Sequence, residues 1–260
     1  MEAIFRSYIQ CVNDDSLEDL PDIMWFPLAL DGGSIPSAEV LVKFIRSAAR
    51  LHIDIDALTT NEETQCLAAK LVKTQDGEDS TIGYTQQAIV RVQNGKISRI
   101  NSLAEEAEVQ RLRSDLISAY DHGSGDARLS ARELEDTYRN YIGSINARTM
   151  VADLPKFCHL QVTYNAERLP LEKYRGLMDA AIAAIPDVVF GIDALVVDAP
   201  AQRVAARIQF DGTPTGPFAG VEPTGSSVRF YEHVTYQFRD GKIDRVWSIV
   251  DLKSYRKQLS

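Results

Sequence analysis

The chain is poor in cysteine, has no long apolar run and carries no excess of basic residues, and each shortage argues against a class of protein. Three cysteines, widely spaced in apolar surroundings, fit neither a disulfide framework nor a zinc site. We expect Cys11, Cys66 and Cys158 to be buried free thiols in a reducing compartment, which favours a cytoplasmic protein. The first residues lack the basic start and apolar core of a signal peptide, and the apolar runs are too short for a membrane span.

The charge balance and the absence of common motifs narrow the function further. The chain has 28 Lys and Arg residues against 37 Asp and Glu residues and no basic stripe, so neither nucleic acid nor a membrane surface is an expected partner. No Gly-x-Ser-x-Gly elbow, phosphate loop or dinucleotide fingerprint occurs. Histidines, cysteines and carboxylates do not have the spacing of metal ligands. We therefore expect no cofactor and no metal.

An internal repeat is the clearest positive feature of the sequence. Short motifs recur in the same order in the two halves: Tyr8-Ile9 and Asn13 as Tyr141-Ile142 and Asn146, Leu20-Pro21 as Leu154-Pro155, Ile55–Leu58 as Ile192–Leu195, and Gly95–Ile97 as Gly241–Ile243. The largest change in their spacing falls at a Gly/Pro-rich loop, Gly212–Gly225, which the first copy lacks. Matches in one order predict two domains of one fold, over residues 1–112 and 133–260, with a helix end and a Gly-rich linker over 113–132.

Both copies predict the same elements, namely a helix, a short strand, a second helix and then several antiparallel strands, which is an α+β class. The first copy is expected to have helices over Ile4–Val12 and Ser37–Ala49, and strands over Leu28–Leu30, Ile53–Leu58, Cys66–Lys73, Tyr84–Gln93 and Lys96–Leu103. The second is expected to have helices over Leu134–Ile145 and Leu171–Ile185, and strands over Leu160–Tyr164, Val188–Val197, Arg203–Phe210, Val228–Arg239 and Lys242–Val250.

The last two strands end on a lone acid, Asp251. Asp240-Gly241 between them is typical of a tight hairpin turn. An acid at the end of an apolar strand can be buried, and burial raises the pKa of its carboxyl, which can then serve as a general acid or base. Asp is also a common N-cap, and a helix is expected to begin near Leu252. The residues alone leave both interpretations open.

The second half resembles a known family. The similarity lies in Asn146, Pro186-Asp187, the loop Gly212–Gly225, Glu232-His233-Val234, Phe238–Ile243, Trp247–Asp251 and Gln258-Leu259. Taken together, these residues resemble the SnoaL-like polyketide cyclases, which have the NTF2-like fold. The first half resembles the family only through the internal repeat. The resemblance implies two tandem cone-shaped α+β barrels, each a curved antiparallel sheet packed on N-terminal helices around an apolar pocket.

The resemblance also implies a function. Such proteins cyclise or isomerise small hydrophobic polyketide-like metabolites without a cofactor, and a terpenoid-like substrate is equally compatible. The family implies that Asp251 is the acid/base of an intramolecular aldol closure, with His233 or His159 in the same cavity. Hydration, dehydration or epoxide opening could use the same groups. A binding or assembly module without turnover is the alternative from another class.

Further residues are candidates for the walls of the pocket. The substrate-binding candidates are Arg207, Phe210, Phe218, Tyr164, Tyr231, Tyr236 and Trp247. Strand arginines and tyrosines are more often surface or packing residues, and His159 could equally be structural. His233 shares a face with Asp251 if a bulged turn at Gly241 sets it opposite Trp247, whereas a plain two-residue turn would not.

The second copy is expected to carry the chemistry. The repeat aligns Glu105 with Asp251, Gln87 with His233 and Trp25 with His159, so the first copy retains one carboxylate and loses its partners. We expect the first domain to be degenerate and structural, forming a pseudo-dimer with the second. A homodimer of the whole chain is also compatible with the sequence.

Overall fold

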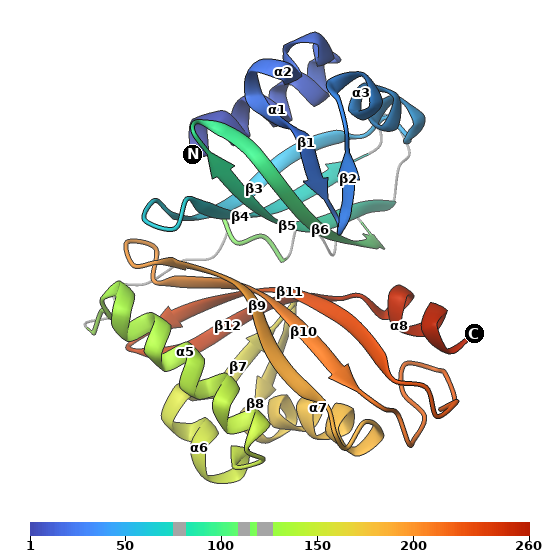
Figure 1. Ribbon diagram of the computed structural model, residues 1–260. Coiled ribbons are helices and arrows are strands. Elements are labelled where there is room, and N and C mark those ends of the chain that lie inside the picture. The colour runs from blue at the N-terminus through green and yellow to red at the C-terminus, as the bar shows by residue number, and fades with distance from the viewer. Residues whose placement is uncertain (75–81, 109–114, 119–126) are drawn as a thin grey trace. The chain divides into compact units, whose positions relative to one another are not determined.

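The computed structural model describes residues 1–74, 82–108, 115–118 and 127–260. These residues form two compact units, Met1–Tyr120 and Asp121–Ser260, each with its own sheet and helices (Figure 1). Of the helix end and linker predicted over 113–132, residues 113–114 and 119–126 lie outside the described residues. Among the residues described, no helix is long and apolar enough to cross a membrane.

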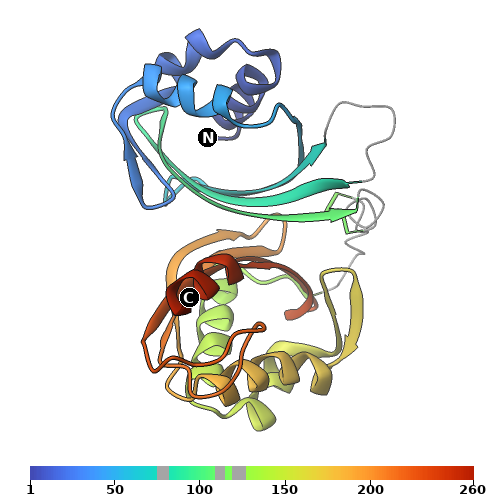
Figure 2. The same ribbon diagram turned by 90° about the vertical axis from the view of Figure 1, so that its right-hand side faces the viewer.

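The first unit is one curved sheet with helices on one of its faces (Figures 1 and 2). Its helical elements are α1 (Glu2–Asp14), the 3-10 turn η1 (Leu17–Asp19), α2 (Leu20–Ile23) and α3 (Ala38–Ser47). Its strands are β1 (Met24–Leu30), β2 (Gly33–Ile35), β3 (His52–Asn61), β4 (Cys66–Thr74), β5 (Ile82–Gln93) and β6 (Lys96–Glu108). The order of these described strands is β2-β1-β6-β5-β4-β3, and among their pairs only β1–β6 is parallel.

The second unit repeats this arrangement. Its helices are α5 (Ala131–Asn146), α6 (Met150–Phe157), α7 (Leu171–Ala184) and α8 (Leu252–Leu259). Its strands are β7 (Cys158–Tyr164), β8 (Glu167–Pro170), β9 (Val189–Asp198), β10 (Arg203–Gly212), β11 (Val228–Arg239) and β12 (Lys242–Val250). The order β8-β7-β12-β11-β10-β9 is that of the first unit, again with one parallel pair, β7–β12. The predicted α+β class with two folds of one kind is confirmed.

The recurring asparagines explain part of the sequence repeat. In the first unit the side chain of Asn13 in α1 binds the backbone of Ile53 in β3, donating to its carbonyl and accepting from its N–H, both at 2.9 Å. In the second unit Asn146 in α5 makes the same two bonds, also at 2.9 Å, with Phe190 in β9. A side chain that satisfies both groups of one backbone residue fixes the first helix against the sheet.

The recurring lysines have a matched role. Lys96, at the start of β6, donates to the carbonyl of Pro21 at 2.6 Å. Lys242, at the start of β12, donates to the carbonyl of Pro155 at 2.7 Å. These bonds satisfy carbonyls near the ends of α2 and α6, where the helix leaves carbonyls without an internal partner. The repeated motifs are therefore contacts that hold helix to sheet.

The differences from the predicted elements are short segments. The segments around Leu20-Pro21 and Leu154-Pro155, for which the sequence predicts no helix, form the short helices α2 and α6. The strands β2 and β8 were not predicted, because three or four residues carry too little alternation to be recognised. The cysteines Cys11, Cys66 and Cys158 are free and buried, as expected.

Candidate functional site

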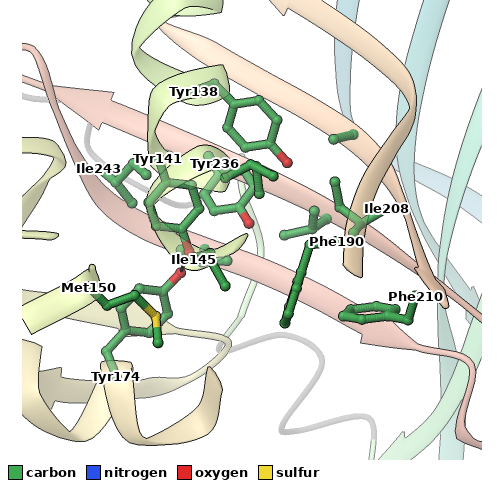
Figure 3. Close-up of a cluster of buried hydrophobic side chains, with 14 of the residues drawn as sticks. Tyr138, Tyr141, Ile145, Met150, Tyr174, Phe190, Ile208, Phe210, Tyr236 and Ile243 are labelled. Carbon is green, nitrogen blue, oxygen red and sulfur yellow. Dashed lines mark hydrogen bonds between the residues drawn. The ribbon is translucent and has the colours of Figure 1, made fainter. Parts of the chain in front are cut away.

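The second unit encloses a cavity of about 220 Å³ between its sheet and the helices α5 and α7. Successive residues of a strand point to opposite faces, so one set of alternating residues lines the cavity. On β10 and β11 that set includes Ile208, Phe210, Phe230, Glu232 and Tyr236. Figure 3 shows buried side chains of this unit, with Phe190, Ile208 and Phe210 on one side and Tyr141, Tyr174 and Tyr236 on the other. The walls are predominantly aromatic and aliphatic.

Glu232 is the one carboxylate among the described residues that line this cavity. It lies on β11 opposite Ile208 of β10 and Val250 of β12, so its surroundings are apolar. The hydroxyl of Ser248 donates to its Oε1. Burial raises the pKa of Glu232 from 4.5 to about 7, although the Ser248 hydrogen bond acts in the opposite direction. Near neutral pH this carboxyl can therefore both take up and release a proton.

The Ser248 hydroxyl is held in place by residues of β7 and the turn after it. The Tyr164 hydroxyl donates to Ser248 Oγ at 3.1 Å, which leaves the serine proton directed at Glu232. Asn165 accepts from the Ser248 N–H at 2.8 Å and donates to its carbonyl at 3.3 Å. A hydrogen-bond chain thus runs from Tyr164 through Ser248 to the carboxyl, and such chains fix the orientation of each member.

Three phenols, of Tyr141, Tyr174 and Tyr236, form another polar part of the cavity wall. The hydroxyls of Tyr141 and Tyr174 lie 2.7 Å apart and point toward one another (Figure 3). The ring of Tyr236 packs edge-on against Tyr141, with 5.7 Å between the centroids. Burial raises the pKa of all three phenols, so they remain protonated at neutral pH. A protonated phenol can donate a hydrogen bond to a substrate oxygen.

The Gly/Pro-rich loop contributes Phe218 to the cavity wall. The loop is tied to the end of α7 by two N–H groups, of Thr215 and Gly216, that donate to the Ala184 carbonyl at 2.9 and 3.1 Å. Phe218 also packs edge-on against Tyr255 of α8, with 5.3 Å between the ring centroids. This part of the wall is therefore fixed at both ends.

The start of the loop requires glycine. A Cβ at Gly212 would lie 2.6 Å from Cγ2 of Ile185 and 2.9 Å from Oδ1 of Asp187. The same Asp187 oxygen accepts from the Thr213 N–H at 2.7 Å. The Pro186-Asp187 motif and the glycine thus share one function, which is to bring the loop close to the end of α7.

Four of the predicted substrate-binding residues line the cavity: Tyr164, Phe210, Phe218 and Tyr236. The rings of Phe190, Phe210 and Phe230 form a row, with centroids 5.0 and 4.8 Å apart. Among the described lining residues, the structure thus brings together the aromatic walls that were expected, with Tyr164 in the chain that reaches Glu232.

The other predicted strand residues, Arg207, Tyr231, His233 and Trp247, belong to the opposite face of the sheet. The β11–β12 hairpin is bulged, because Gln237 pairs with Arg245 and Phe238 with Ile243. The bulged alternative of the sequence analysis placed His233 opposite Trp247. In the structure His233 lies opposite Ile249 instead, and Thr235 lies opposite Trp247. His233 does share the face of Trp247, but Glu232 and Tyr236 show that the cavity lies on the other face.

Arg207 and Tyr231 contact each other on that opposite face. The Arg207 guanidinium lies 3.4 Å from the centroid of the Tyr231 ring and pairs with Asp193 at 2.5 Å. The Tyr231 hydroxyl donates to Gln209 at 3.2 Å. These contacts describe a polar surface of the sheet, separate from the described lining of the cavity.

Asp251 and His159 have structural contacts. Asp251 is the N-cap of α8, and its Oδ1 accepts from the Ser254 N–H at 3.0 Å. Its neighbours Val250 and Leu252 line the cavity, whereas Asp251 is absent from the described lining. His159 Nε2 lies 2.9 Å from the Arg239 carbonyl at the hairpin turn. The cap interpretation of Asp251 thus agrees with its geometry.

Glu232 was missed as a site residue, although the sequence contains a signal for it. It lies in an alternating apolar series that runs from Phe230 through Val234 and Tyr236 to Phe238. A single acid in such a series faces the protein interior with the apolar side chains around it.

For metals, the part of the chain that the structure describes holds no group of three or more His, Cys, Asp or Glu side chains placed to bind an ion.

Comparison with known proteins matches the second half of the chain to a family. The family model for SnoaL-like polyketide cyclases matches residues 135–259. A SnoaL-like polyketide cyclase from Agrobacterium tumefaciens is 38% identical, with 49% of this chain and 98% of that chain covered and a TM-score of 0.46. IdmH from Streptomyces antibioticus is 22% identical, over 48% and 97% of the two chains, with a TM-score of 0.44. TsrD from Streptomyces laurentii is 20% identical, over 51% and 98%, with a TM-score of 0.45. No curated protein matches the chain.

Proposed function

Because the chain belongs to the SnoaL-like polyketide cyclase family, we propose that its second unit is a cofactor-independent cyclase or isomerase. Its substrate is a small, hydrophobic, polyketide-like or terpenoid-like metabolite. The observation that carries the proposal is Glu232, a carboxyl with a pKa of about 7 in an apolar cavity that also holds protonated phenols. An acid/base group is most effective when its pKa lies near the working pH.

The reaction requires only groups of this cavity. The Glu232 carboxylate removes a proton from a carbon next to a substrate carbonyl, and the electron pair forms an enolate. A tyrosine hydroxyl donates a hydrogen bond to the enolate oxygen and stabilises its charge. The enolate carbon then attacks a second carbonyl carbon of the same molecule. The new alkoxide takes the proton back from Glu232, so the product is an isomer of the substrate.

Glu232 replaces Asp251 as the acid/base in this proposal. The Asp251 carboxylate accepts from the Ser254 N–H and is absent from the described cavity lining. Glu232 lines the cavity and has Ser248 as a hydrogen-bond donor, which holds the carboxyl in one orientation. A catalytic base must lie within reach of the proton that it removes, and the place of Glu232 in the cavity wall therefore supports it as the base.

The repeat supports placing the reaction in the second unit. The β5 residue that corresponds to Glu232 is Gln86, which lines a cavity of the first unit. An amide has no proton to exchange near neutral pH, so it cannot replace the carboxyl.

A binding protein without turnover is the second candidate. Two observations favour it, namely that both units contain a cavity and that Asp251 caps a helix. The raised pKa of Glu232 argues for chemistry instead, because burying a carboxyl without a use for it costs stability.

The deciding experiment compares two variants of the full chain in a producing host by mass spectrometry of metabolites. With Glu232→Gln we expect the product to be lost and a precursor of the same mass to accumulate. The matched control is Asp251→Asn, because Asn caps helices as well as Asp and the profile should stay that of the parent. A precursor that differs by one water would indicate hydration or dehydration. An unchanged profile from folded Glu232→Gln protein would reject catalysis and leave the binding protein.

A further inference from the structure

We propose that the first unit, which the sequence suggested to be structural, is a second binding site for an apolar molecule that carries a carboxylate, with Lys73 as the residue that holds the carboxylate. Its cavity of about 620 Å³ is larger than that of the second unit. This volume lies within the range of small-molecule sites. The inference does not depend on the reaction proposed for the second unit.

The walls of this cavity suit an apolar body. They are formed by α1 and α3 on one side and by the sheet on the other, with Phe5, Ile9, Leu41, Leu71 and Ile100 among the described lining residues. Phe44 of α3 also lines the cavity, although its exposed fraction is 55%. Small-molecule sites are lined mainly by apolar and aromatic side chains, so this lining suits an apolar ligand.

Lys73 changes the chemistry of the wall relative to the second unit. On β4 it pairs with Ile53 of β3 and Tyr84 of β5. At the matching position of the second unit, Phe210 pairs with Phe190 and Phe230. The first unit thus has a cation at the position where the second unit has the middle ring of a row of three. Lys73 is one of the described lining residues of the first cavity.

The charges around Lys73 favour an anion. Burial lowers the pKa of Lys73, and the negative charge of Asp31 counteracts this effect only in part. Asp31 is engaged with Ser102, whose N–H and hydroxyl donate to its carboxylate at 2.5 and 3.1 Å. A ligand carboxylate next to Lys73 would offset the loss of hydration of the ammonium with a charge-assisted hydrogen bond.

The remaining charges do not change this preference. Arg46 and Asp15 also line the cavity, and they form an ion pair at 3.4 Å. Arg50 is a further cation of the lining, so the cations among the described lining residues outnumber the carboxylates. The ligand is therefore an anion with an apolar body. Since Gln86 takes the place of the proposed acid/base, we expect the ligand to bind without being converted.

Calorimetry of the full chain with decanoate and with decanol tests this site. We expect decanoate to bind the parent, and the Kd to rise at least tenfold in Lys73→Met, while the affinity for decanol is the same in both. The matched control is Lys43→Met, which removes an exposed lysine of α3 that pairs with Glu39. It should bind decanoate like the parent. Equal decanoate affinity of Lys73→Met and the parent, or no binding by the parent, would overturn the proposal.

The location of bound decanoate can be determined on the unmodified protein. We expect nuclear Overhauser effects from its methylene protons to the methyl groups of Leu71 and Ile100, which line the first cavity. Effects confined to Ile208 and Val246, which line the second cavity, would contradict the proposal even if Lys73→Met did not fold. That result would leave the reaction proposed for the second unit untouched, since the reaction depends on Glu232 and the tyrosines of the second cavity and not on Lys73.

Discussion

Replacing Glu232 by Gln should stabilise the second unit at alkaline pH, and the gain should disappear in acid. Burial holds the pKa of Glu232 at about 7 in the folded protein, against an ordinary value of 4.5. Below pH 4.5 the carboxyl is protonated in both folded and unfolded chains, so it adds no pH-dependent cost. Between pH 4.5 and 7 only the unfolded chain ionises, and the free energy of unfolding falls as the pH rises.

The size of the effect follows from the two pKa values. One pKa unit corresponds to about 1.4 kcal/mol, so ionised Glu232 lowers the free energy of unfolding by at most about 3 kcal/mol above pH 7. Glutamine has no proton to lose in this range and still accepts from Ser248 through its carbonyl oxygen. The difference in unfolding free energy between Glu232→Gln and the parent should therefore grow from near zero at pH 4 to about 3 kcal/mol at pH 8.

Urea unfolding from pH 4 to pH 9, followed by tryptophan fluorescence, measures this difference. Both proteins should carry Trp25→Phe, so that buried Trp247 of β12 alone reports on the second unit. The control is Glu222→Gln, which removes the same charge from an exposed position in the loop and should show no such pH dependence. A Glu232→Gln protein whose stability relative to the parent does not change with pH would refute the assignment of a raised pKa to Glu232.

Two further predictions concern the groups around this carboxyl. Ser248→Ala removes the hydrogen bond that lowers the pKa of Glu232, so the pKa should rise further, and the titration of ¹³C-labelled Glu232 by NMR should move to higher pH; a shift to lower pH would contradict the role of Ser248. Gly212→Ala places a Cβ 2.6 Å from Ile185 and should cost about 1–3 kcal/mol of unfolding free energy, whereas Gly176→Ala in α7, with nothing within 4 Å, should be neutral or stabilising in the same urea assay.

The sequence predicted the long elements of the fold because their apolar patterns are strong and occur twice. Strands such as β4 and β10 begin at the predicted residues, Cys66 and Arg203. The repeat pointed to Asn13 and Asn146, which make equivalent bonds to the sheet. The elements that were missed are short, and Pro155 lies inside one of them, α6, where proline argues against a helix.

The site could be predicted only in part, because both faces of β11 are buried. Val234 and Tyr236 on the cavity face are 1% and 4% exposed, and His233 and Thr235 on the other face are 1% and 4% exposed. With no polar face to compare, alternation cannot tell which set of residues faces the cavity. The register depends on a bulge at Asp244, three residues after Gly241 of the turn that the sequence identifies. Choosing Glu232 over its neighbour required the helices that close the cavity.

The two units show how one frame can carry two different cavities. The bonds of Asn13 and Asn146, like those of Lys96 and Lys242, go to backbone groups and hold helices to the sheet. Side chains that face the cavities take no part in these bonds, so they can change with little effect on the frame. The changes at Lys73 against Phe210 and at Gln86 against Glu232 are of this kind. At each of these two positions one unit has an ionisable side chain and the other does not. The first cavity has the cation Lys73, and the second has the carboxyl of Glu232, whose pKa is about 7. A cation in an apolar wall favours binding of an anion, whereas a carboxyl that exchanges protons near neutral pH favours catalysis. We therefore propose a different role for the same fold in each half of the chain.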